Sequence, residues 1–287
     1  MEKIAFIGAG VMGKNMIRNF MKKGIEVYFY TRTHEKVLDL IEEGAIWCDN
    51  ISDCASRANV IITMVGFPDD VRSVYLDEGG IVESANSGAY LIDMTTTEPN
   101  LEKEIAKIAQ ERGLHFLDAP VSGSDVKAKA GTLTIMVGAS DDDFEACYPV
   151  FEYIGKTIIH EGPVGAGQHT KMANQIAISG TIAGVCEALF YAKKAGLDEN
   201  KTLITISSGA AGSFQMDNVA PKILDEDYEP GFFIKHFVKD MKIAVKEAER
   251  NGIELPILNE VLKNYEEIEK EGMENLGIHA LYKFYDK

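Results

Sequence analysis

The first 162 residues alternate between short apolar runs and segments with the periodicity of helices, and this alternation constrains the fold most. The apolar runs predict strands at 3–8, 25–30, 59–65, 89–96, 114–123, 132–139 and 156–160. The segments between them predict helices at 11–24, 34–44, 69–76, 98–113 (with Thr97 as its cap) and 141–155. Short connections between strands and helices are typical of a mainly parallel sheet covered on both faces. We therefore predict an α/β fold, a doubly wound Rossmann-type domain, over residues 1–162.

The pattern changes after this point, because the strand signals give way to long helical periodicities. These predict helices at 168–196, 198–209, 232–252 and 256–272. We therefore predict an all-α C-terminal domain over residues 163–287, used for substrate binding and oligomerisation. The helix over 168–196 is apolar around most of its circumference, and one small domain does not readily cover so much apolar surface. A homo-oligomer, either a homo-dimer or a homo-tetramer, is expected for this reason.

Charge and cysteine content exclude several classes of function. A net charge of −16 opposes non-specific binding to nucleic acid and to anionic lipid. We find no window that approaches the apolar length of a membrane span and no secretory signal, so a cytoplasmic location is expected. The four cysteines and six histidines show no metal-ligand spacing, so we predict reduced thiols and no metal site.

The stretch "FIGAGVMGKNM", residues 6–16, contains the spacing G-x-G-x-x-G between a predicted strand and a predicted helix. In a βαβ unit, Gly8 allows the tight turn and Gly10 lets a pyrophosphate approach backbone N–H groups where the helix begins, at Val11 and Met12. Gly13 lets the helix pack closely on the strand. A turn followed by an accidental helix glycine is the alternative, but the surrounding alternation favours a dinucleotide site.

The end of the second predicted strand bears on which dinucleotide is bound. An NAD site normally has an acid there, whose carboxylate binds the ribose hydroxyls. This sequence has Thr31, Arg32 and Thr33 instead. The Arg32 guanidinium could pair with a 2′-phosphate, assisted by the Thr33 hydroxyl, which favours NADP over NAD. Alternatively, Arg32 is a solvated loop residue.

Two further stretches combine polar residues in a way that could bind substrate. In "DAPVSGS" (118–124), Ser122 and Gly123 follow a strand and could bind a small carboxylate-bearing substrate, or they could simply form a turn. In "GAGQHTKMANQ" (165–175), Lys171, Asn174 and Gln175 share nearly one face of the long helix. A lysine on an otherwise apolar helix either extends its amine to solvent or serves a cleft.

Four stretches taken together, "FIGAGVMGKNM", "DAPVSGS", "GAGQHTKMANQ" and "FFIKHFVKDMKIA", resemble the β-hydroxyacid dehydrogenases. That family includes 3-hydroxyisobutyrate dehydrogenase, tartronate semialdehyde reductase (2-hydroxy-3-oxopropionate reductase) and the glyoxylate/succinic semialdehyde reductases. The resemblance implies an NAD(P)-dependent oxidoreductase that interconverts a small β-hydroxy acid and its semialdehyde, with a cleft between two domains. It implies that Lys171 is the general acid/base of the hydride transfer.

The resemblance also implies roles for other residues. Ser122 and Gly123 would hold the substrate carboxylate, and Asn174 with Gln175 would orient the substrate. The implied cofactor contacts are Met64, Val65, Thr95, Thr96 and Lys239, the last of them from the helical domain. The sequence departs from the family in its tail, where Gly277 and His279 stand at positions that are commonly Asp and Ser.

Two alternatives remain open at this point. One is a glyoxylate/succinic semialdehyde reductase, which differs only in substrate. The other is a non-catalytic dinucleotide-binding sensor module, which would have no need of a lysine at the domain junction. A 6-phosphogluconate dehydrogenase resembles the chain locally but has a much larger helical domain.

Overall fold

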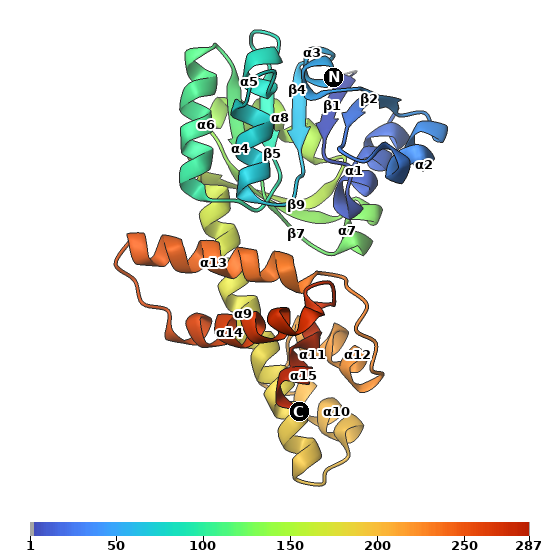
Figure 1. The fold of residues 1–287 in the computed structure, drawn as a ribbon, viewed down its shortest axis with the longest axis vertical. Coiled ribbons are helices and arrows are strands. Elements are labelled where there is room, and N and C mark those ends of the chain that lie inside the picture. Colours follow the sequence, from blue (N-terminus) through green and yellow to red (C-terminus); the bar gives the residue numbers. More distant parts are fainter. Residues whose placement is uncertain (1–2, 287) are drawn as a thin grey trace. The chain divides into compact units, whose positions relative to one another are not determined.

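The computed structural model describes residues 3–286 and divides the chain into two compact units, Met1–Lys171 and Met172–Lys287 (Figure 1). The first unit contains one nine-stranded sheet. Its strands are β1 (Lys3–Ile7), β2 (Glu26–Tyr30), β3 (Ile46–Trp47), β4 (Val60–Thr63), β5 (Tyr90–Asp93), β6 (His115–Asp118), β7 (Val121–Ser122), β8 (Leu133–Gly138) and β9 (Gly155–Gly162). Its helices are α1 (Val11–Lys22), η1 (His34–Val37), α2 (Leu38–Glu42), α3 (Ile51–Ser56), α4 (Pro68–Leu76), α5 (Ile81–Ser84), α6 (Pro99–Glu111), α7 (Asp125–Ala130) and α8 (Asp141–Phe151).

The strand order is β3-β2-β1-β4-β5-β6-β8-β7, with β9 paired to β8. The first six strands of this order are mutually parallel, whereas β8 is antiparallel to β6 and β7. The order reverses between β1 and β4, and in open α/β sheets this reversal opens a ligand crevice beyond the carboxyl ends of the strands. The predicted doubly wound, mainly parallel sheet is therefore confirmed.

Side chains of β1 show why the sheet carries helices on both faces. Ile4 and Phe6 pack into one cluster with α1, α2 and α8, while Ala5 and Ile7 pack into a second cluster with α3 to α6. Successive side chains of a strand point to opposite faces, so an uninterrupted apolar run buries both faces at once. Figure 1 shows α4, α5 and α6 together on one side of the sheet.

Several local predictions were wrong. The run 114–123 is not one strand but β6 and β7, interrupted at Pro120, which has no N–H to donate to a neighbouring strand. The helix predicted from residue 34 begins as the 3₁₀ turn η1 and continues as the short α2. Thr97 does not cap α6, because Glu98 is the residue before the helix and the buried Thr97 hydroxyl has no hydrogen-bond partner. The short α3, α5 and α7 were missed, because one or two turns carry too little periodicity.

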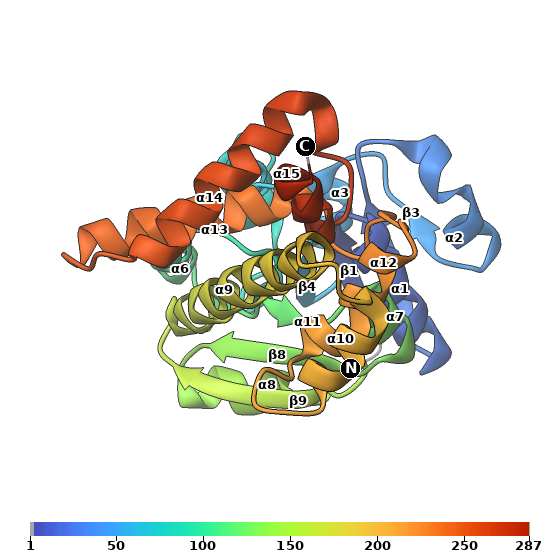
Figure 2. The same cartoon turned by 90° about the horizontal axis from the view of Figure 1, so that it is seen from below.

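The second unit is helical over its described residues. Helix α9 (Ala166–Lys194) begins in the first unit and continues into the second. It is followed by α10 (Glu199–Ser207), α11 (Phe214–Asn218), α12 (Ala220–Leu224), α13 (Ile234–Arg250), α14 (Pro256–Ile268), the π turn η2 (Glu269–Met273), the 3₁₀ turn η3 (Ile278–Leu281) and α15 (Tyr282–Tyr285). Ile182 of α9, Phe237 of α13 and Tyr265 of α14 belong to one apolar core, and these helices can be followed from below in Figure 2.

Helix α9 passes the length and composition test for a membrane span, so the expectation that no window does so was wrong. The core helix of a water-soluble protein can have the same length and composition. Gln168, Lys171 and Gln175 of this helix are buried and hydrogen-bonded inside the protein. We therefore interpret α9 as a core helix.

The departure from the family in the tail has a structural explanation. His279 is buried, and its Nε2 lies 2.7 Å from the carbonyl oxygen of Asp227. Its ring stacks on Tyr228, and burial lowers its pKa. A Cβ at Gly277 would clash with this ring, so Gly277 provides the space that His279 occupies. Gly277 and His279 together therefore allow the segment before α15 to pack against the loop that contains Asp227 and Tyr228.

Candidate functional site

The glycine motif lies where β1 ends, next to the reversal of the strand order. Gly8 has φ +101°, a conformation that favours glycine, and its N–H donates to the Tyr30 carbonyl oxygen at 2.8 Å. A Cβ at Gly8 would clash with the carbonyl oxygen of Met64, and a Cβ at Gly13 would clash with that of Gly8. Two of the three glycines are therefore required for packing of α1 against the ends of β1 and β4.

Gly10 differs, because its surroundings are open. No heavy atom outside its chain neighbours lies within 4 Å of a Cβ built there. Gly10 precedes α1 without a side-chain cap, and the first turn of this helix has no acidic residue. Val11 is 58% exposed, and Met12 is half-buried. The first N–H groups of a helix attract an anion, so the motif fits the pyrophosphate of a dinucleotide.

Thr31, Arg32 and Thr33 follow β2, and the last two are exposed. Arg32 is 79% exposed, and its Nη1 donates to Asp70 Oδ1 at 3.0 Å. The other oxygen of the Asp70 carboxylate accepts from the Phe67 N–H, at the start of α4. Arg32 is thus held by a carboxylate with which a phosphate group would compete.

The ends of β4 and β5 are joined by hydrogen bonds. The N–H of Val65 donates to Thr95 Oγ1 at 3.0 Å, and the N–H of Thr95 donates to Asp93 Oδ1 at 2.9 Å. Thr95 is buried, so its hydroxyl fixes the backbone of the neighbouring loop, whereas Met64, Val65 and Thr96 are half-buried. These loops follow two neighbouring parallel strands and so lie at the carboxyl edge of the sheet.

Lys171 lies in the second turn of α9 and is only 7% exposed. Its Nζ donates to the carbonyl oxygen of Val121 at 2.9 Å. Ser122, the next residue in the chain, is half-buried, and Gly123 has φ +134°. The structure therefore brings the amine and the Ser122–Gly123 turn together, although 49 positions separate Lys171 from Ser122 in the sequence.

The remaining predicted residues belong to the second unit, where they form one chain of contacts. The Asn174 amide donates to Gln175 Oε1 at 2.7 Å, and Gln175 Nε2 donates to Asp240 Oδ2 at 2.6 Å. Lys239 Nζ lies 3.0 Å from the other oxygen of Asp240. Gln175 is fully buried, so its amide orients Asn174 and Asp240. The sequence suggested Gln175 as a direct substrate contact, and this arrangement does not favour that role.

Sequence reasoning missed a group of buried polar residues beneath Lys171. Asp118 accepts hydrogen bonds from the N–H groups of Gly165 and Gln168, at 2.6 and 2.8 Å. Burial raises its pKa to about 7, and these two N–H donors oppose a larger rise. Both Asp118 and Gln168 stand within the stretches already singled out, but nothing in the spacing indicates that they meet.

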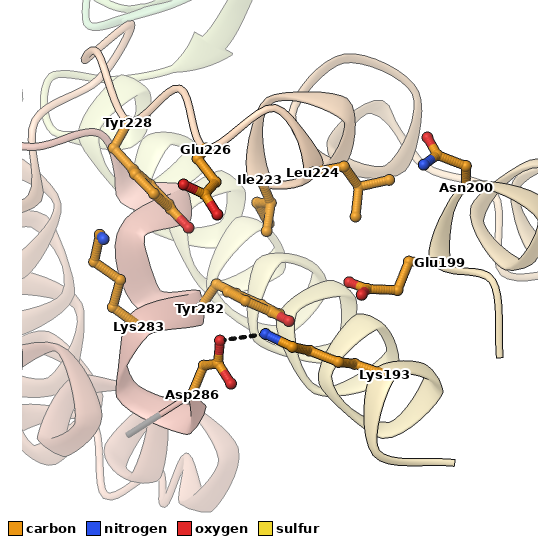
Figure 3. Close-up of a pocket in the computed structure, with 10 residues that line it drawn as sticks. All are labelled: Lys193, Glu199, Asn200, Ile223, Leu224, Glu226, Tyr228, Tyr282, Lys283 and Asp286. Carbon is orange, nitrogen blue, oxygen red and sulfur yellow. Dashed lines mark hydrogen bonds and ion pairs between the residues drawn. The ribbon is translucent and has the colours of Figure 1, made fainter. Parts of the chain in front are cut away.

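A hollow of about 300 Å³ opens on the second unit and contains none of the predicted site residues (Figure 3). Its walls come from α9, α10, α12, the loop that follows α12, and α15. The Lys193–Asp286 ion pair, with Nζ and Oδ2 2.6 Å apart, lies at its edge. Its lining mixes lysine and acidic side chains, and this mixture indicates no particular ligand.

Comparisons with known proteins match both parts of the chain to family models. Residues 3–162 match the family model described as the NAD binding domain of 6-phosphogluconate dehydrogenase. Residues 165–285 match the model described as NAD-binding of NADP-dependent 3-hydroxyisobutyrate dehydrogenase. Together with the glycine-lined end of β1, these matches define an NAD(P)-dependent dehydrogenase that acts on CH–OH groups. The chain belongs to the β-hydroxyacid dehydrogenase family, which includes 3-hydroxyisobutyrate dehydrogenase.

Relatives cover nearly the whole chain. The uncharacterized oxidoreductase YkwC of Bacillus subtilis is 50% identical over 286 residues, 100% of this chain and 99% of the relative. The probable 3-hydroxyisobutyrate dehydrogenase-like 1 of Arabidopsis thaliana is 42% identical, over 97% of this chain and 84% of the relative. The NAD-dependent L-serine dehydrogenase of Pseudomonas aeruginosa is 33% identical, over 100% and 98%.

A solved structure gives the same picture of the fold. The 3-hydroxyisobutyrate dehydrogenase of Mycobacterium tuberculosis, described with L-serine, superposes with a TM-score of 0.89 at 26% identity. The match covers 99% of this chain and 98% of the other.

Proposed function

We propose that the protein interconverts a small β-hydroxy acid and its semialdehyde, as 3-hydroxyisobutyrate dehydrogenases do, with Lys171 as the general acid/base. The observation that carries this proposal is the buried Lys171 amine, which is hydrogen-bonded to Val121 beside the Ser122–Gly123 turn. Burying an ammonium group is costly, and such a group at the end of a sheet points to chemistry rather than to packing.

The cofactor, when bound, supplies hydride for reduction and accepts it in oxidation. The Lys171 ammonium donates a proton to the alkoxide oxygen during reduction, and as an amine it takes the hydroxyl proton during oxidation. The Val121 carbonyl fixes the position of Nζ. The Ser122 hydroxyl and the backbone N–H of Gly123 bind the substrate carboxylate, and the Asn174 amide, oriented by Gln175, holds the substrate hydroxyl.

The names of two relatives support a compact substrate. 3-Hydroxyisobutyrate and L-serine both carry a primary alcohol on the carbon β to a carboxylate. A site with one carboxylate-binding turn and one lysine suits this spacing of groups. Glyoxylate or succinic semialdehyde reduction is the alternative, and it uses the same residues on a different carbon chain.

Cofactor choice and cellular setting complete the proposal. NADP is preferred over NAD because Arg32 follows β2 where an acid would bind the ribose hydroxyls. The proposed cofactor residues follow β1, β2, β4 and β5 or, in one case, belong to α13. They are Gly8, Gly10, Val11, Met12, Gly13, Thr31, Arg32, Thr33, Met64, Val65, Thr95, Thr96 and Lys239. The enzyme is cytoplasmic, and its partners are small molecules and further copies of itself.

Self-association follows from the exposed side of α9. Ala173, Ala177, Thr181 and Gly184 are exposed at helical spacing on this side, and a Cβ at Gly184 would meet nothing within 4 Å. A second copy would cover this surface in a homo-dimer or homo-tetramer. Sedimentation at equilibrium should give twice or four times the chain mass of 31.6 kDa, and a monomer at all concentrations would contradict this.

Lys171→Ala tests the chemistry. We expect kcat to fall about 10²–10⁴-fold, the usual contribution of a general acid/base, while NADPH binding by fluorescence titration stays unchanged. Lys194→Ala, an exposed lysine on the same helix, serves as the matched control.

Substrates should be screened with NADPH and NADH. The reductive direction takes methylmalonic, tartronic and succinic semialdehydes and glyoxylate, and the oxidative direction takes 3-hydroxyisobutyrate and serine. Near-normal turnover of Lys171→Ala on every accepted substrate would refute the assignment of the general acid/base. Tight cofactor binding without turnover on any substrate would favour the sensor module instead.

A further inference from the structure

Three carboxyl groups lie fully buried beneath the first turns of α9, on Asp93 of β5, Glu102 of α6 and Asp118 of β6. The hydrogen bonds recorded to them come from neutral donors: the Thr63 hydroxyl, the Gln168 amide and the N–H groups of Thr95, Gly165 and Gln168. A buried, unpaired carboxylate is costly, and three together repel one another. Such a cluster is stable only if hydrogen-bond donors surround some of its members and protons neutralise others.

Asp118 is the member that backbone donors satisfy. Its two oxygens accept from the N–H groups of Gly165 and Gln168, so it caps the start of α9 from inside the protein. Three positions after Asp118, the carbonyl of Val121 accepts from Lys171 Nζ. The segment that leaves β6 is therefore tied to α9 at two points, one turn apart.

Gln168 connects this cap to the carboxyl end of β5. Its Nε2 donates to the Thr95 carbonyl oxygen at 2.7 Å and to Glu102 Oε1 at 2.8 Å. Its Oε1 accepts from the N–H of Thr97 at 3.1 Å. Every polar group of the Gln168 amide is thus used, and the residue stands three positions before Lys171, on nearly the same side of the helix.

Glu102 is the member best placed to carry a proton. Its Oε2 and the Oδ2 of Asp93 are both buried and have no hydrogen-bond partner. Burial, followed by the charges of Asp93 and Asp118, raises the pKa of Glu102 well above its usual value. The pKa of Asp93 is also raised by burial, but donors from Thr63 and Thr95 oppose the rise. The two carboxyl groups are near enough for a side-chain hydrogen bond, so a proton on Glu102 that is shared with Asp93 would give the orphaned oxygens a partner.

We propose that Glu102 is a positioning residue that acts as a neutral carboxylic acid. Glu102 accepts a hydrogen bond from Gln168, and Gln168 fixes the first turns of α9 against the ends of β5 and β6. The position of the Lys171 amine, one turn further along α9, depends on this contact. This inference rests on the proposed function only in taking Lys171 as the general acid/base.

Steady-state kinetics of three variants tests the inference. The variants are Glu102→Gln, Glu102→Ala and the control Glu104→Gln. Glutamine mimics the neutral acid, since its amide donates toward Asp93 and accepts from Gln168, so kcat should stay near the wild-type value. Alanine should lower kcat about 10- to 100-fold with little change in the KM for NADPH, because a displacement of about 1 Å costs up to about 10²-fold. Glu104 lies on the exposed side of α6, paired with Arg72, and its variant should behave as wild type.

The dependence of kcat on pH separates positioning from simple packing. At high pH the wild type should lose activity as Glu102 gives up its proton among Asp93, Asp118 and Tyr75, the titratable groups that face it. Glu102→Gln should lack this loss, because the glutamine amide has no acidic proton to give up. Identical alkaline limbs for the two proteins would contradict the inference.

A spectroscopic measurement does not depend on turnover or on the alanine variant folding. With ¹³C-labelled glutamate, the side-chain carboxyl signal that is lost in Glu102→Gln should not titrate in the usual acidic range. An ordinary acidic titration would overturn the neutral state. If Lys171→Ala is inactive and Glu102→Ala is fully active, only the positioning role of Glu102 is refuted. If Lys171→Ala is active, the proposed function is refuted, and the carboxyl titration then remains as the test of the neutral state of Glu102.

Discussion

Helices α1 and α9 both begin in the first unit, yet their N-termini are treated in opposite ways. At α1, Gly10 leaves open space and provides no side-chain cap. At α9, the Asp118 carboxylate reaches in from the end of β6 and accepts from two N–H groups. Neither helix has an acidic residue of its own in its first turn.

The two helices differ in what fills the hydrogen-bonding capacity of their first N–H groups. The first N–H groups of any helix lack partners within the helix and favour negative charge. Where the chain supplies its own acceptor, as Asp118 does at α9, these N–H groups are satisfied internally and the helix is anchored to the end of β6. Where it supplies none, as at α1, the same groups would be available to the phosphate of the cofactor in the site that we propose.

Removing the internal cap should have the largest effect on stability. Asp118→Ala leaves two buried N–H groups without acceptors, and we expect a loss of about 2–5 kcal/mol in the free energy of unfolding, measured with urea. Asp141→Ala removes an exposed acid from the first turn of α8 and should cost less than about 1 kcal/mol. Equal losses for the two variants would show that the α9 cap is no anchor.

The raised pKa of Asp118 sets the direction in which pH should change the stability of the folded protein. The pKa of Asp118 is raised to about 7 in the folded protein, so between its unfolded value and about 7 the folded state binds more protons than the unfolded state. Stability should therefore fall as pH rises through this window and then level off. In Asp118→Asn the fall between about pH 5 and pH 8 should be smaller, though not absent, because Glu102 and Asp93 contribute in the same direction.

Substitutions of Gly10 and Gly13 in the α1 motif separate packing of this helix start from cofactor binding. Gly13→Ala clashes with the Gly8 carbonyl and should lower stability by about 1–3 kcal/mol. Gly10→Ala meets open space, so its melting temperature should not fall, but its methyl group should weaken NADPH binding about tenfold, or ~1.4 kcal/mol. Calorimetry of unfolding and of NADPH binding distinguishes these effects, and unchanged binding in Gly10→Ala would mean that no phosphate lies there.

The smallest effect concerns cofactor choice. Arg32→Ala should raise the KM for NADPH more than that for NADH, because only NADPH carries the 2′-phosphate. Asp70→Asn, which releases Arg32 from its ion pair, should shift the preference in the opposite direction, toward NADPH. Steady-state kinetics with both cofactors measures the ratio, and equal changes for the two would remove the case for NADP.

Much of the fold was predictable because its signals are local. Apolar runs on β1 and β4 are buried on both faces, and Gly8 and Gly13 each permit one close backbone approach. The buried carboxyl cluster was not predictable in the same way. Glu102 shares the buried side of α6 with Ile105 and Ala109, a position where periodicity calls for an apolar residue. Its partner Gln168 is 66 positions away.

The sequence by itself determined where strands and helices alternate, where a dinucleotide motif stands and which helix carries an isolated lysine. Each of these depends on spacing within one or two elements. Only the tertiary structure decided that Asp118 fills the start of α9 while the start of α1 stays bare, and that Gln175 lies between Asn174 and Asp240. Burial and charge pairing arise between segments distant in sequence, and spacing along the chain does not encode them.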